Sequence, residues 1–127
     1  MGRIIDIQFN DKTYTIEHDR ASVYAYFGNK VKQLENQDAN IEDIKNEELV
    51  KKVMSSITLD DIVDIVYYGL QKHHKDDMPS KDELFGLIVV LPNLEGFFTE
   101  VVNSIKEVLS AIKEDKKGNA TWGVRKN

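Results

Sequence analysis

Two adjacent histidines followed closely by two aspartates form the one cluster in the sequence whose residue types suit a metal ion. His73 and His74 close an apolar helical segment, and Asp76 and Asp77 come soon after them. Neighbouring residues on a helix point about 100° apart, so adjacent histidines seldom bind one ion. His73 and Asp77 have the spacing of one helical turn, but the polar residues around them indicate that the helix ends in between. The sequence therefore indicates a solvated, basic helix end, and we expect no metal ion and no cofactor.

Catalytic motifs of other kinds are missing from the sequence. The chain has no cysteine, which excludes a disulfide framework, thiolate metal ligands and a thiol nucleophile. Asp60 and Asp61 lie in the first turn of a predicted helix, where carboxylates stabilise the helix dipole. No serine lies in a nucleophile motif, and the glycines inside helical patterns are isolated instead of forming a phosphate-binding loop. We therefore expect a protein that is not an enzyme and takes no small-molecule substrate.

Size and composition fit one soluble domain. The chain has 127 residues, of which 41% are hydrophobic and 31% charged, enough for one real core. A net charge of −5 disfavours nucleic-acid binding unless positive charges cluster. The N-terminal segment reaches an aspartate too early for a signal peptide, and no apolar run approaches the roughly 18 residues of a membrane span. We expect an intracellular protein that binds neither nucleic acid nor a membrane.

Alternating apolar and polar residues near the N-terminus predict a β-hairpin. A two-residue turn at Asn10-Asp11 sets Ile7 opposite Tyr14. The same register sets Ile5 opposite Ile16, so both strands present one apolar face. Because a lone hairpin is marginally stable in water, we expect this face to pack on helices.

Helical periodicity follows the hairpin through most of the remaining chain. It predicts helices over about 22–35, 41–56, 58–74, 81–91 and 94–113. The third of these is apolar around most of its circumference, which indicates a central helix covered from several sides. Asp19, Thr58 and Ser80 are the expected N-caps. Gly28-Asn29 interrupts the first pattern, at a point where that helix could end or bend.

Together these patterns predict an α+β fold, mostly α, with an N-terminal β-hairpin packed on a bundle of about five helices. We expect a single globular domain over residues 1–113, with the hairpin at about 3–17 and the helices at about 20–113. Residues 114–127 lose the helical periodicity and gain lysine, glycine and asparagine. That change predicts a flexible C-terminal tail.

The last predicted helix carries a seam of apolar residues at steps of four and three. Such a seam is long for so small a domain. We expect most of it to lie in the core, and part could serve self-association or a partner helix. If any of the seam is exposed, the candidate contact residues are Phe98, Val101, Ile105 and Val108. The sole tryptophan, Trp122, lies in the tail, and two interpretations stay open: a docking residue, or a side chain folded back loosely on the body.

Three parts of the chain resemble one family of small phage proteins. They are Ile7–Glu17 with Asp19–Val23, then Tyr68–His74, then Gly118–Trp122. In this order they resemble the tail assembly chaperones of long-tailed phages and prophages of Gram-positive bacteria. The chain departs from the family at Asp11, where the turn usually has glycine, and at Lys75, where proline commonly follows the histidines. Residues 35–57 match nothing in the family.

The resemblance implies a non-enzymatic role. Tail assembly chaperones coat the aggregation-prone tape measure protein while tail tube subunits polymerise around it. They are mostly helical, self-associate into spirals and leave before the tail is complete. The resemblance therefore implies that this chain binds and solubilises the tape measure protein, has the tail tube protein as a possible second partner and forms a homo-oligomer. It also implies a place in the cytoplasm of the bacterial host and absence from the mature virion. Many members have a short form and a frameshifted long form, and this chain would be the short form.

Two other functions stay open at this point. One is a small phage or prophage regulatory protein that binds nucleic acid, which would place Lys30-Lys32 and Lys51-Lys52 on one basic face. The other is a small metal-dependent enzyme, which would require the paired histidines and a carboxylate to converge on one point.

Overall fold

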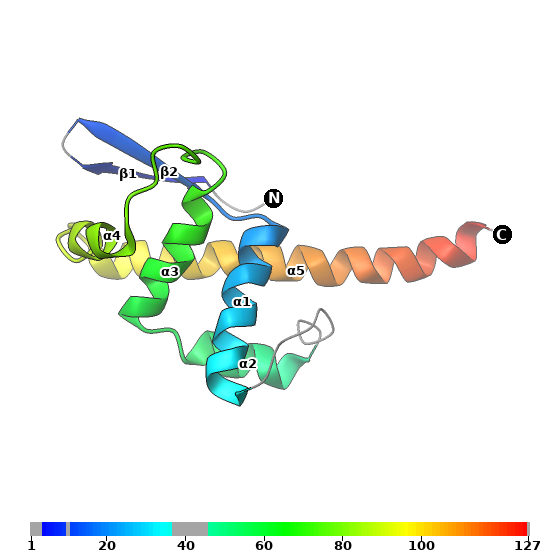
Figure 1. The fold of residues 1–127 in the computed structure, drawn as a ribbon. Helices are drawn as coiled ribbons and strands as arrows, with labels where there is room; N and C mark the ends of the chain where they lie inside the picture. The colour runs from blue at the N-terminus through cyan, green and yellow to red at the C-terminus, as the bar shows by residue number, and fades with distance from the viewer. Residues whose placement is uncertain (1–3, 10, 37–45, 127) are drawn as a thin grey trace.

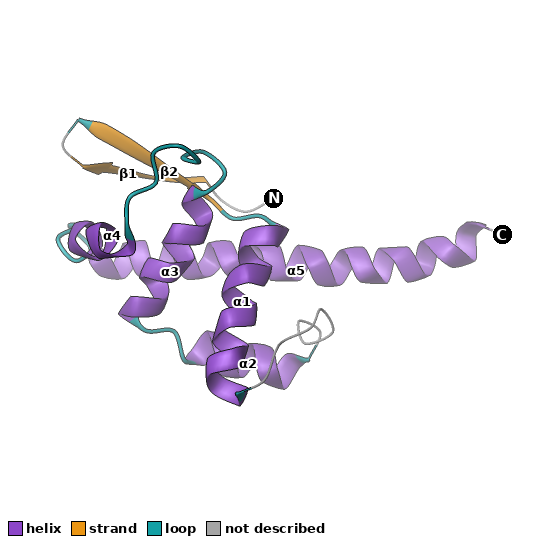
Figure 2. Cartoon of the chain, in the orientation of Figure 1, coloured by secondary structure: helices purple, strands orange, loops and turns teal. Residues whose placement is uncertain are grey.

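The computed structural model describes the backbone of residues 4–9, 11–36 and 46–126, and the side chains of these residues as far as Ala111. A two-stranded antiparallel hairpin is followed by five helices (Figures 1 and 2). The elements are β1 (Ile4–Phe9), β2 (Lys12–Glu17), α1 (Arg20–Glu35), α2 (Glu47–Ser55), α3 (Leu59–Leu70), α4 (Lys81–Ile88) and α5 (Leu94–Lys126). The predicted α+β fold, mostly α, with its N-terminal hairpin, is confirmed.

The hairpin has the predicted register. Ile7 pairs with Tyr14, and Ile5 pairs with Ile16. Phe9 pairs with Lys12, so the connection has two residues, although Asn10 itself lies outside the described residues. Ile7 and Ile16 are buried. The apolar face therefore lies against the helices, as a hairpin that is unstable alone requires.

Three helices begin at the predicted caps. The side chains of Asp19, Thr58 and Ser80 accept hydrogen bonds from backbone N–H groups of α1, α3 and α4, each within a capping box. The interruption predicted at Gly28-Asn29 is wrong, because α1 continues through both residues to Glu35. The contacts on the buried side of α1 outweigh the low helix propensity of these two residues. α1 ends instead at Asn36, whose φ of 55° is left-handed.

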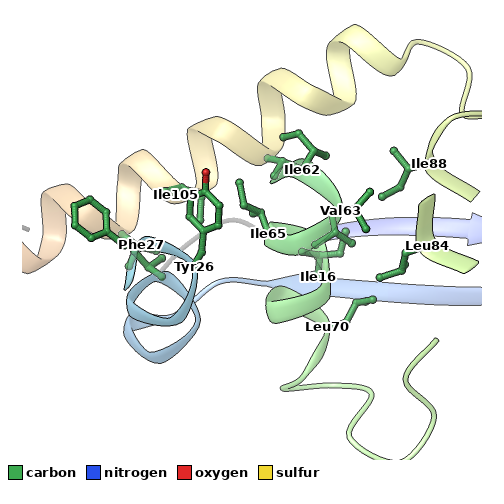
Figure 3. Close-up of a cluster of buried hydrophobic side chains, with 14 of the residues drawn as sticks. Ile16, Tyr26, Phe27, Ile62, Val63, Ile65, Leu70, Leu84, Ile88 and Ile105 are labelled. Carbon is green, nitrogen blue, oxygen red and sulfur yellow. The ribbon is translucent and has the colours of Figure 1, made fainter. Parts of the chain in front are cut away.

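The third helix is central, as its apolar circumference predicted. α3 contacts α1, α4, α5 and β2. Figure 3 shows Ile62, Val63 and Ile65 of α3 among side chains of the surrounding elements. These three residues are buried, as are Ile16 of β2 and Ile105 of α5. Burial of apolar surface on several sides of one helix supplies most of the driving force for this arrangement.

Several helix boundaries differ from those that periodicity predicted. α2 begins at Glu47, and residues 41–45 of the predicted helix lie outside the described residues. α3 ends at Leu70, and residues 71–73 form a turn before His74. α5 does not stop near residue 113 but runs to Lys126, beyond the other elements in Figure 1. The flexibility predicted for residues 114–127 stays a prediction. Within the described residues, no helix combines the length and apolar character needed to cross a membrane.

Candidate functional site

A groove of about 820 Å³ opens between α2 and α5. Among the described residues, its lining combines four apolar side chains with six polar or charged ones. They are Val50, Met54, Val102 and Leu109, with Glu48, Lys51, Lys52, Ser55, Lys106 and Ser110. Among the described residues of the lining there is no histidine. A groove of this size and composition can take up apolar side chains of another molecule.

Helical geometry explains how the groove obtains its apolar lining. Val53 of α2 and Val101 of α5 are fully buried in the core. The next residue on each helix lies about 100° further round its axis. Met54 and Val102 therefore lie beside the core and stay half-buried. The same packing that buries one row of each helix presents the adjacent row to the groove.

Positive charge predominates among the described residues of the groove. Lys51 of α2 and Lys106 of α5 are exposed, and neither forms an ion pair with another described residue. Lys52 bonds to Glu35 of α1. Glu48 is the one carboxylate among the described residues of the lining. Exposed ammonium groups on both helices, with apolar side chains between them, suit an amphipathic helix whose apolar face is flanked by carboxylates.

The seam residues predicted as contact candidates lie mostly in the core. Val101, Ile105 and Val108 are buried beneath the other elements, so they form no surface on the folded chain. Phe98 is half-buried and packs against the core. The side chain of Trp122 lies outside the described residues. The apolar residues with which α5 lines the groove, half-buried Val102 and buried Leu109, are neighbours of the seam. The seam itself packs toward α1 and α3.

Among the described residues, the large exposed apolar side chains lie at two places outside the groove. Ile4 and Phe9 belong to β1, and Phe85, Val89 and Val90 belong to α4 and the turn after it. The alternation of the strand places Phe9 on the apolar face with Ile5 and Ile7, yet its side chain is exposed. In β1, Ile4 alternates with buried positions, and in α4 only one side of the helix faces the core.

The paired histidines bond to different partners. His73 Nε2 lies 2.8 Å from one oxygen of Glu17, and Lys72 Nζ lies 2.8 Å from the other. These two hydrogen bonds lower the pKa of Glu17 to about 2. His74 Nε2 accepts a hydrogen bond of 2.8 Å from the backbone N–H of Thr15. The turn after α3 is thereby attached to β2.

The proton of the His74 ring can be placed from these contacts. Because Nε2 accepts a hydrogen bond, a neutral ring carries its proton on Nδ1. Nδ1 lies 3.1 Å from Asp77, which also forms an ion pair with Lys12. The bonds from Lys12 and His74 lower the pKa of Asp77. Among the described residues, no group of three or more His, Cys, Asp or Glu is arranged to hold a metal ion. The geometry gives His73 and His74 a structural role.

A third histidine, which the sequence analysis did not single out, lies in the core. His18 Nε2 lies 2.9 Å from the backbone carbonyl of Ile65, and Nδ1 lies 3.0 Å from the hydroxyl of Ser104. A carbonyl can only accept, so Nε2 donates to Ile65 and Nδ1 accepts from Ser104. Burial lowers the pKa of His18. One neutral ring therefore joins the end of the hairpin to α3 and α5.

A buried ion pair joins α1 to α3. Lys30 Nζ lies 2.7 Å from Asp61, and both side chains are less than a tenth exposed. Asp61 also accepts the backbone N–H of Thr58 and so caps α3 at the same time. Lys30 cannot contribute to a basic surface in this position, and Lys52 is engaged with Glu35. Two of the lysines that a basic, nucleic-acid-binding face would use are therefore engaged with carboxylates.

Two of the three segments on which the expected family resemblance depends meet in space. Thr15 and Glu17 of the first contact His74, His73 and Lys72 of the second. Gly69 of the second segment lies against Ile16 of the first. Comparisons of the chain with models of protein families, with curated proteins and with solved structures find no match.

Proposed function

We propose that this chain is a phage tail assembly chaperone that binds and solubilises a tape measure protein without catalysing a reaction. The groove between α2 and α5 is the observation that carries the proposal. Val50, Met54 and Val102 line it half-buried, and the buried Leu109 forms part of its floor. Val101, Ile105 and Val108 of the seam are already buried in the core. A tape measure protein is a long helical chain with apolar faces, and an apolar groove suits such a face.

The length of the groove fits a helix of two to three turns. α2 has nine residues and is therefore about 13 Å long at 1.5 Å per residue. Apolar anchors at positions i, i+3 or i+4, and i+7 of a docked helix span about 10 Å. One groove would therefore take three anchors. The affinity of so short a contact is modest, which agrees with a chaperone that must later release its client.

Several copies bound along one client would compensate for this modest affinity. Each copy raises the effective concentration of its neighbours if the copies also contact one another. Self-association therefore belongs to the proposal, as does a place in the cytoplasm of the bacterial host and absence from the finished virion. A contact with the tail tube protein, which displaces the chaperone, would complete the cycle.

Co-expression tests this proposal directly. A segment of the tape measure protein from the same phage or prophage is produced in bacteria alone, with this chain, and with a groove variant carrying Met54→Glu and Val102→Glu. We expect the segment to be insoluble alone and soluble and co-purified with the unaltered chain, because the groove covers its apolar face. The groove variant should leave it insoluble.

A matched control separates the groove from general apolar surface. The variant with Val89→Glu and Val90→Glu also removes two accessible apolar side chains, but these lie on the turn after α4. It should solubilise the segment as well as the unaltered chain does. Failure of the unaltered chain to solubilise any tape measure segment would reject the proposed function.

A further inference from the structure

The two outer edges of the hairpin differ in what covers them. The outer edge of β2 is occupied, because the backbone N–H of Thr15 donates to His74 Nε2 at 2.8 Å. Glu17 bonds to Lys72 and His73 along the same edge, and Lys12 bonds to Asp77. The segment after α3 thus covers the outer edge of β2, so that another strand cannot pair with it.

The outer edge of β1 is open in the part of the chain that the structure describes. Since the N–H of Thr15 points away from β1, Thr15 and its partner Asp6 form a pair whose backbone groups face outward. Strict alternation gives Ile4 and Gln8 the same outward orientation. No hydrogen bond joins the backbone of these three residues to another described residue across this edge. The edge therefore offers a row of unpaired donors and acceptors.

Exposed side chains accompany this open edge. Ile4 and Phe9, at the two ends of β1, are 63% and 43% exposed. Asp6 and Gln8 lie exposed between them. Asp6 is held in place by the hydroxyl of Thr15, which donates to it at 2.9 Å. An open strand edge with apolar ends is a surface on which another strand can pair.

We propose that the β1 strands of two copies of this chain pair antiparallel about a twofold axis at Ile7, which makes a four-stranded sheet. In this register the outward backbone groups of Asp6 face those of the partner's Gln8, and the outward groups of Gln8 face those of the partner's Asp6. The Asp6 carboxylate then lies opposite a carboxamide that can donate to it. Phe9 lies opposite the partner's Ile5, on the apolar face, and gains a cross-strand contact.

The alternative registers are less favourable for reasons visible in β1 itself. An axis at Asp6 would place two carboxylates directly opposite each other, which is destabilising. An axis at Ile5 would leave Gln8 and Phe9 beyond the paired region. The placement of the helices agrees with an accessible β1, because α3 packs mainly on β2. The charge at Asp6 thus disfavours the axis at Asp6, and the axis at Ile7 is the one that sets Asp6 opposite Gln8.

This inference names a surface for self-association and does not depend on a tape measure protein. The pairing uses β1, whereas the proposed client uses the groove between α2 and α5. A monomeric chain that still solubilises a tape measure segment would overturn the pairing alone. A chain that pairs through β1 but solubilises no segment would overturn the proposed function alone.

Proline substitution on the two hairpin edges tests the pairing. Gln8→Pro removes an outward N–H without removing a hydrogen bond of the hairpin, because Gln8 and Thr13 form an outward-facing pair. Thr13→Pro makes the same change on β2 and is the matched control. Mass is measured by light scattering and sedimentation over a wide range of concentrations. The unaltered chain and Thr13→Pro should form dimers, and Gln8→Pro should weaken dimerisation at least about tenfold, since it removes two symmetry-related hydrogen bonds.

A second pair of variants keeps the backbone intact in case proline disturbs the hairpin. Gln8→Glu places a second carboxylate opposite Asp6 and should weaken the dimer. Gln8→Lys places an ammonium there and should preserve or strengthen it. A chain that stays monomeric at every concentration would overturn the inference. A dimer that responds equally to all four substitutions, or to none, would also do so.

Discussion

A methyl group on Gly69 would lie 2.7 Å from Nε2 of His18 and 2.6 Å from Cγ2 of Ile16. The imidazole therefore approaches α3 at the one helical position that has no side chain. This approach lets His18 donate to the Ile65 carbonyl, one turn earlier on α3. Gly69 and His18 together fix how the end of the hairpin meets the central helix.

We predict that Gly69→Ala destabilises the fold. Both neighbours of the added methyl group are buried, so the hairpin or α3 must shift to admit it. Overpacking of this kind costs about 1–3 kcal/mol. The free energy of unfolding, from urea titration followed by circular dichroism, measures the loss.

The matched control for this substitution is Gly28→Ala in α1. Nothing lies within 4 Å of a methyl group there. Alanine in a helix interior then stabilises by about 0.5–1 kcal/mol relative to glycine. Equal effects at the two glycines would contradict the close contact between Gly69 and His18.

We predict that His18 makes stability depend on pH below neutrality. The pKa of buried His18 is below its ordinary value of 6.5. As pH falls through 6.5, His18 becomes protonated in the unfolded chain but stays neutral in the folded chain. Protonation therefore favours the unfolded chain, and the stability present above pH 6.5 is progressively lost. The slope can reach about 1.4 kcal/mol per pH unit for one group. His18→Gln should reduce this slope, because glutamine can keep both hydrogen bonds but does not titrate.

The measurement is the free energy of unfolding at several pH values between 5 and 7.5. This range lies above the pH at which Glu17 titrates. The pKa of Glu17 is lowered from 4.5 to about 2 in the folded chain, so the stability that its carboxylate contributes is lost only as pH falls from about 4.5 to about 2. His73→Gln, an exposed histidine, is the control and should leave the His18 component unchanged. An identical slope for His18→Gln and the unaltered chain would show that His18 is not the titrating group.

We predict that Lys30→Met is strongly destabilising. It leaves the Asp61 carboxylate buried without its cation, a change that costs about 3–5 kcal/mol. Adding Asp61→Asn should recover part of this loss, because the unpaired charge is then removed. Lys72→Met breaks the exposed ion pair with Glu17 and should cost much less. Chemical denaturation of the four proteins measures these differences, and similar losses for Lys30→Met and Lys72→Met would contradict a buried pair.

Local patterns were sufficient to predict much of this fold. The two-residue turn fixed the pairing of Ile7 with Tyr14, and short-range capping residues marked the starts of α1, α3 and α4. Each of these features depends on residues within a few positions of one another. The central position of α3 also followed, since a helix that is apolar on nearly all sides must be covered on nearly all sides.

Features that depend on distant residues were not predicted. His18 contacts residues 47 and 86 positions away, and Lys30 contacts a residue 31 positions away. No local pattern distinguishes these polar residues from exposed ones. Gly69 was considered only as an isolated glycine, because its role depends on how His18 approaches it.

The contact residues predicted on α5 belong to its buried seam, whereas the groove is lined by the residues next to that seam. The regular seam of α5 indicated the residues with the strongest apolar pattern, and those are the ones that the core uses. The groove residues Val102 and Leu109 lie beside the seam and outside its regular steps of four and three. Its other wall comes from α2, and the apposition of two helices so far apart in sequence is a tertiary property.

The most direct test of the central claim is the affinity of this chain for amphipathic helical peptides from a tape measure protein, measured by calorimetry. The unaltered chain and the variant with Val89→Glu and Val90→Glu should bind such a peptide equally. The variant with Met54→Glu and Val102→Glu should bind at least about tenfold more weakly, because two buried anchors lose their apolar partners. Equal affinities for the groove variant and the unaltered chain, or no binding by either, would contradict a client site between α2 and α5.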